Sequence, residues 1–165
     1  MATDIKGYIS QLTSKDSAQQ GAAAEALAQL GPDARPAAAA LVRACGTEDD
    51  SNREWVTSAL EGLGPPPAEQ MKDLIALTSD KSLDVAYWAA TLLGRLGAAA
   101  GPAVPGLTTA LEKHAEQAVR ERAAWALGQI GPAAKSATPA LRAAAAGNQP
   151  RLARMANEAL EAVGG

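Results

Sequence analysis

The residue types that most often carry enzyme chemistry are scarce in this 165-residue sequence. His114 is the single histidine and Cys45 the single cysteine, so neither has a second histidine or cysteine at metal-ligand spacing. A serine nucleophile would need that same histidine as its base, and no G-x-S-x-G segment is present. No G-x-x-x-x-G-K-S/T phosphate-binding loop occurs either. We therefore expect a protein that is not an enzyme and that binds no metal ion and no cofactor.

Aromatic side chains offer a different kind of chemistry, namely the binding of a partner. Trp55 and Trp88 are separated by one period of a sequence repeat described below, and we expect Tyr87, Trp88 and Trp125 to form a partly exposed cluster. Exposed aromatic clusters often mark protein-binding surfaces. The alternative is that these large rings only cover an alanine-rich surface between helices. The candidate partner-binding residues, which include two basic residues of the opposite face, are Tyr87, Trp88, Trp125, Trp55, Arg43 and Lys72.

A repeated helix signal positions these residues. Between residues 119 and 132, apolar residues recur at helical spacing, and a Gly-Pro step then ends the helix. A glycine ends the same pattern at a regular interval of about 33 residues, a typical period for helical repeats. These glycines are Gly31, Gly64, Gly97, Gly131 and Gly164.

A second column of residues has the same period. It lies in the helix that follows each glycine, and its members are leucines at the same regular interval. They are Leu41, Leu74, Leu107 and Leu141. Two independent columns therefore predict the same repeat.

The repeat predicts an all-α fold, because a helix pair of about 33 residues cannot bury its apolar face alone and must stack on its neighbours. We expect one domain over residues 1–165, a right-handed α-solenoid of about four helix pairs with a half repeat at each end. First helices would form the convex face, with the aromatic cluster, and second helices the concave face. The expected units are 1–15, about 16–49, 50–81, 82–115 and 116–148, and a terminal helix at 149–165.

The sequence resembles the bacterial HEAT-like repeats of the phycobilisome-lyase type. The resemblance rests on Val119-Arg120, Ala123-Ala124 and Ile130-Gly131, followed by Thr138-Pro139-Ala140-Leu141. Asp84-Val85, Ala89-Ala90 and Val104-Pro105-Gly106-Leu107 repeat it one unit earlier. It covers nearly the whole chain and implies a helical-repeat fold, whereas lyase-type repeats occur widely without lyase activity.

Two columns depart from a uniform repeat. Such units usually carry an arginine at one fixed position. In this chain that position is occupied by Gln20, Arg53, Ala86, Arg120 and Ala153, which predicts looser coupling between some units. Gly94 and Gly128 stand at the same place inside the helices of successive units, although a helical glycine costs about 1 kcal/mol relative to alanine. We interpret these two glycines as points where the paired helix of the same unit approaches closely.

Composition limits the environment and the partners. Hydrophobic residues make up 47% of the chain, without phenylalanine, and no run approaches the length of a membrane span. Cys45 falls in an apolar stripe, so we expect a buried, reduced thiol. No leader segment opens the sequence, so we expect a soluble, cytoplasmic protein. The net charge of −3 does not favour nucleic-acid binding, although residues 118–165 carry +3.

Several functions remain open from the sequence. The first hypothesis is a non-enzymatic protein–protein interaction scaffold with an unidentified protein partner. The second is a regulatory or substrate-handling module related to lyase-type HEAT repeats, and the third is weak nucleic-acid binding, supported only by the basic residues after 118. The fourth is self-association through the repeat ends. No membrane or metal partner is expected.

Overall fold

The computed structural model describes residues 3–165, and within that range the regular elements are all helices. The α-helices are α1 (Ile5–Leu12), α2 (Ser17–Leu30), α3 (Ala38–Ala44), α4 (Asp50–Gly62), α5 (Met71–Leu77), α6 (Leu83–Arg95), α7 (Val104–Lys113), α8 (Gln117–Ile130), α9 (Thr138–Ala145) and α10 (Pro150–Val163). Short 3-10 segments lead into the second helices, at Gly31–Ala37, Ala68–Gln70, Gly97–Ala103 and Gly131–Ala137.

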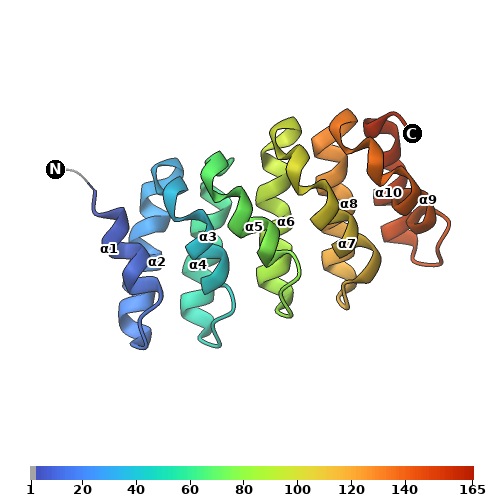
Figure 1. Cartoon of the computed structure of the whole chain (residues 1–165). Helices are drawn as coiled ribbons and strands as arrows, with labels where there is room; N and C mark the ends of the chain where they lie inside the picture. Colours follow the sequence, from blue (N-terminus) through green and yellow to red (C-terminus); the bar gives the residue numbers. More distant parts are fainter. Residues whose placement is uncertain (1–2) are drawn as a thin grey trace.

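The helices form two layers that run in a row from one terminus to the other (Figure 1). Each of α3, α5, α7 and α9 packs against the helix that follows it across a short loop. We call the layer of α2, α4, α6, α8 and α10 the first-helix face, and the layer of α3, α5, α7 and α9 the second-helix face. The predicted all-α solenoid is confirmed.

Glycine ends each first helix, as the repeat predicted. Gly31, Gly64, Gly97, Gly131 and Gly164 are the residues with positive φ in the described chain, between 54° and 77°. Side chains with a Cβ avoid this region, so an alanine there would strain the turn. The period of these glycines therefore fixes where each first helix stops.

The core consists of two columns of buried leucines. The predicted second-helix column, Leu41, Leu74, Leu107 and Leu141, is fully buried. A matching first-helix column is also fully buried, and its members are Leu27, Leu60, Leu93 and Leu127. Alanine is the most frequent residue of the described core, and its small side chain lets the layers approach closely.

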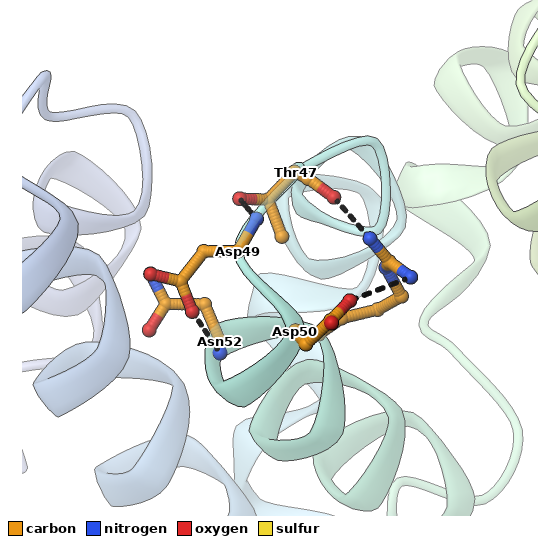
Figure 2. Close-up of polar contacts among 5 residues, drawn as sticks. Thr47, Asp49, Asp50 and Asn52 are labelled. Atoms are coloured by element: carbon orange, nitrogen blue, oxygen red, sulfur yellow. Dashed lines mark hydrogen bonds and ion pairs between the residues drawn. The ribbon is translucent and has the colours of Figure 1, made fainter.

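Polar side chains tie several first helices to the loop before them, and α4 shows this most fully. Asp49 caps α4 by accepting the Asn52 N–H at 3.0 Å, and its own N–H donates to the Thr47 hydroxyl at 3.3 Å (Figure 2). Arg53 donates to the Thr47 carbonyl at 3.1 Å and pairs with Asp50 at 3.2 Å. The loop and the first two turns of α4 are thereby held together.

The hydrogen bond from Arg53 to the Thr47 carbonyl has equivalents in other units. Arg120 donates to the His114 carbonyl at 3.0 Å, and Gln20 donates to the Ser14 carbonyl. Each donor stands six residues after its acceptor, as Arg53 does. Ala86 cannot make this bond, and the equivalent carbonyl, Asp80 O, instead accepts the N–H of His114 Nε2 at 2.9 Å.

His114 is therefore a structural histidine. Because a carbonyl only accepts, Nε2 carries the proton, and Nδ1 accepts the Glu116 N–H at 3.1 Å. The single histidine links the loop after α7 to the loop before α6. It replaces the arginine that the third unit lacks.

Two further predictions concern burial. Cys45 is 2% exposed, so its predicted burial is confirmed, and that burial raises the pKa of its thiol to about 12. None of the helices in residues 3–165 has the length and apolar character that a bilayer span requires.

Candidate partner-binding surface

The candidate surface begins on α6, where Tyr87 and Trp88 are neighbours. Their ring centroids lie 6.2 Å apart, with an interplanar angle of 85°, which is an edge-to-face arrangement. Both side chains are partly buried. The Arg95 guanidinium, two turns further along α6, lies 5.6 Å from the centroid of Trp88.

Arg122 of α8 joins α6 to the third aromatic residue. Its guanidinium carbon lies 4.4 Å from the Tyr87 centroid and 4.8 Å from the Trp125 centroid, and Arg122 donates to the Tyr87 hydroxyl. Cations at such distances are attracted to the ring face. The result is a continuous arginine–aromatic stack over two repeats, which consists of Arg95, Trp88, Tyr87, Arg122 and Trp125.

A glycine in α6 lets Trp125 lie against that helix. A Cβ on Gly94 would stand 2.5 Å from Trp125 Cζ3 and 3.1 Å from the Ala126 Cα. Gly94 is thus a point of close approach, as predicted, but the helix that it meets is α8 of the next unit and not its paired helix α7. At Gly128 likewise, a Cβ would stand 3.2 Å from the Ala159 Cα of α10. Because Gly94 has no side chain, Trp125 can pack directly against α6.

A hollow of about 220 Å³ lies beside the stack, between α6, α8 and α10. At its wall the largely buried Glu121 accepts a hydrogen bond from Gln117 Nε2 at 2.8 Å and pairs with Arg151 at 3.1 Å. The exposed Arg151 and the stacked Arg122 leave two guanidinium groups beside one carboxylate. The hollow is lined by Tyr87, Ala118, Glu121, Arg122, Trp125, Arg151 and Met155.

The six candidate residues lie in different places. Tyr87, Trp88 and Trp125 come together in the stack, whereas Trp55 is 40% exposed on α4 and belongs to no ring or cation pair in the described chain. The two basic candidates lie on the second-helix face. Arg43 forms an ion pair with Asp73 at 3.1 Å, and Lys72 is exposed on α5.

Sequence reasoning missed the charged members of this surface. Arg95, Arg122 and Glu121 were not among the candidates, although Arg122 occupies the place of Trp88 in the next unit. Burial and the nearby Arg122 guanidinium lower the pKa of Arg95, and the Glu61 carboxylate opposes that shift.

The arrangement is suited to recognition. Within residues 3–165, no three histidine, cysteine or acidic side chains gather in a way that could hold a metal ion. The stack offers ring faces, guanidinium donors and a small hollow, which are features of protein-binding surfaces.

Comparison with known proteins identifies the repeat. The HEAT-repeat family pattern matches residues 71–161, more than half of the chain. This chain belongs to the HEAT-repeat family. No curated protein matches the sequence of this HEAT-repeat chain.

Solved structures agree with the HEAT-repeat fold. One engineered protein has 22% sequence identity and a TM-score of 0.64, over 98% of this chain and 80% of its own. The complex of CpcE and CpcF of phycocyanin lyase from Nostoc sp. PCC7120 has 22% identity and a TM-score of 0.63, over 99% of this chain and 66% of that chain. At these identities the likeness shows the fold alone.

Proposed function

We propose that this HEAT-repeat protein is a non-enzymatic protein–protein interaction scaffold whose partner docks on the arginine–aromatic stack. One observation supports this most directly. Three aromatic rings and two guanidinium groups from two repeats form one continuous, partly exposed surface. Tryptophan, tyrosine and arginine are the residue types that dominate binding energy at protein interfaces.

The charges around the hollow indicate which kind of protein segment fits this surface. Arg122 and Arg151 both line the hollow, where Glu121 is the single acidic residue, and residues 118–165 carry six basic against three acidic residues. A protein segment with an acidic residue beside an apolar one fits this surface, because the acid meets the guanidinium groups while the apolar side chain enters the hollow.

Affinity capture with matched variants tests the proposal. The immobilised full chain should retain a protein from native lysate that Arg122→Ala and Trp125→Ala lose. Trp55→Ala is the control, because Trp55 is an exposed tryptophan of the same face outside the stack. Circular dichroism must show that every variant is folded. A partner that binds Arg122→Ala and Trp125→Ala as tightly as the unaltered chain does would contradict the proposal.

A second candidate is a regulatory or substrate-handling module of the lyase type. It is supported by the structural similarity to the CpcE and CpcF complex, which spans 99% of this chain. Incubation of the chain with a bilin and its acceptor protein tests this candidate. Absorbance that does not change relative to the acceptor alone would exclude bilin attachment.

A further inference from the structure

A second hollow lies on the opposite face of the molecule, between the loop that follows α5 and the helix α7. Its volume is about 440 Å³, which is in the usual range for small-molecule sites. Equivalent positions two repeats earlier, between α1 and α3, surround a smaller hollow of about 310 Å³. The lining residues of the larger one are Thr78, Ser79, Asp80, Lys81, Gly106, Thr109, Ala110, Lys113, His114 and Ala115.

The α5–α7 hollow is open because two side chains that close the neighbouring groove are missing. Between α3 and α5, Arg43 and Asp73 form an ion pair across the groove. The residues one repeat later are Ala76 and Gly106, which have no such groups. A Cβ on Gly106 would stand 3.1 Å from Ile75 Cγ2, so even alanine is tightly accommodated there.

Most polar groups of this hollow are already bonded within the protein. The Asp80 carboxylate accepts the Ser82 N–H at 2.8 Å, and the Asp80 carbonyl accepts the His114 ring N–H. The hydroxyl groups donate to carbonyls of their own helix: Thr78 to Ile75 at 2.7 Å, Ser79 to Ala76 at 3.1 Å and Thr109 to Pro105 at 3.1 Å.

The lysine ammonium groups are the remaining donors. Lys81 and Lys113 are exposed at the rim, and within residues 3–165 neither forms an ion pair. Their flexible stems let both charges swing toward an occupant of the hollow. An apolar body beneath two ammonium groups suits a ligand with an apolar chain or ring and one anionic group.

We propose that this hollow binds a small amphiphilic carboxylate, such as a medium-chain fatty acid. The apolar part lies along Gly106 and Ala110, where it is removed from water. The carboxylate lies between the ammonium groups of Lys81 and Lys113, which gain an ionic partner at the rim of the hollow. This ligand site is separate from the arginine–aromatic stack on the first-helix face.

Fluorescence titration with 8-anilinonaphthalene-1-sulfonate tests the site, because this dye combines apolar rings with one anionic group. Saturable binding of about one dye molecule per chain is expected, with displacement by octanoate but much weaker displacement by 1-octanol. The double variant Lys81→Glu/Lys113→Glu should weaken dye binding by about tenfold or more, because charge attraction becomes repulsion. Thr109→Trp should remove saturable binding by filling the hollow.

Two control variants separate this site from other surfaces. Lys72→Glu changes an exposed lysine of α5 outside the hollow, and Trp125→Ala alters the stack, so neither should change the dye affinity. If Thr109→Trp does not fold, the lysine variants still test the proposal, because both lysines are exposed and their substitution should not disturb the fold. Dye binding that does not saturate, that the lysine variants leave unchanged, or that 1-octanol displaces as well as octanoate does would overturn the proposal.

Discussion

Adjacent first helices pack in two ways in this solenoid. At the α6–α8 and α8–α10 junctions the helices approach closely, because Gly94 and Gly128 leave room for Trp125 with Ala126, and for Ala159. At the α4–α6 junction the two helix backbones stay apart. Figure 1 shows the corresponding wider spacing between α4 and α6. The repeat period is regular, but the spacing between units is not.

One position explains the difference. The residue one repeat before Gly94 is Glu61, an exposed residue with a long side chain where α6 has only a hydrogen atom. Arg95 instead spans the junction and donates to the Leu60 carbonyl at 2.7 Å. The α2 helix has Ala28 at this position and packs closely on α4. A small residue there permits contact, and a long one prevents it.

The missing arginine of the repeat does not set this spacing. Ala86 in α6 and Ala153 in α10 both lack it, yet α10 packs closely on α8. The expectation that a broken arginine column loosens the units therefore fails for α10. The loss at Ala86 is offset by His114, which bonds the free carbonyl.

The end of α3 fills part of the wide junction. α3 packs against α6, and a Cβ on Gly46 would stand 3.5 Å from Val85 Cγ2. Cys45 is close enough to Arg53 of α4 and Asp84 of α6 for both charges to act on its pKa. Its buried thiol therefore lies at the α4–α6 junction, where an opening of that junction would expose it.

The substitution Gly94→Leu should have the largest effect, because it places a long side chain against Trp125 and the Ala126 backbone at a close junction. Overpacking of this kind destabilises by about 3 kcal/mol. Urea unfolding measures the change, provided that the m-value is constant. Gly62→Ala is the control: its Cβ would meet only the Gly31 Cα at 3.9 Å, so stability should stay equal or rise by up to about 1 kcal/mol. Equal effects at the two positions would contradict the comparison.

Arg95→Ala should have an intermediate effect, because it removes the hydrogen bond to Leu60 and the cation over Trp88. A loss of about 1–2 kcal/mol is expected. Hydrogen exchange should then accelerate in α4 while the amides of α8 keep their protection. Uniform acceleration through both helices would show that the wide junction is not an independent weak point.

Asp49→Asn should have the smallest effect, a loss of stability at the α2–α4 junction that is present above about pH 4 and fades in acid. The Ser17 hydroxyl, followed by the Asn52 N–H, holds the pKa of Asp49 below its usual value of 3.8. A lowered pKa in the folded state contributes stability above pH 3.8, which is lost as the pH falls further. Urea unfolding as a function of pH should show a shallower loss of stability below about pH 4 in the variant. An unchanged slope would exclude this contribution.

Sequence periodicity predicted the helices and where they end, but not the distances between them. The five glycines and the Leu41 column predicted the helix ends and the core, because backbone conformation and burial repeat with the sequence. A close approach at Gly94 followed from the cost of a helical glycine, but its partner, α8 in place of the paired α7, did not. The wide junction did not follow, because it depends on how Glu61 and Arg95 of different units meet in space.

The candidate surface was predictable only in its aromatic part. Tyr87, Trp88 and Trp125 stand out by residue type, and the sequence predicted that they form one partly exposed cluster. The insertion of Arg122 between two rings depends on its side-chain conformation at the junction of two repeats, which periodicity does not encode. The hollow between α5 and α7 likewise depends on helix spacing.

Native-state labelling of Cys45 with iodoacetamide, followed by mass spectrometry, tests the junction comparison most directly. The closed thiol is inert, so labelling requires an opening that exposes Cys45. The opening free energy should be at least about 1 kcal/mol smaller than the free energy of global unfolding, and Arg95→Ala should lower it further while Gly62→Ala leaves it unchanged. Labelling that follows global unfolding alone, in the unaltered chain and in both variants, would contradict a weak α4–α6 junction.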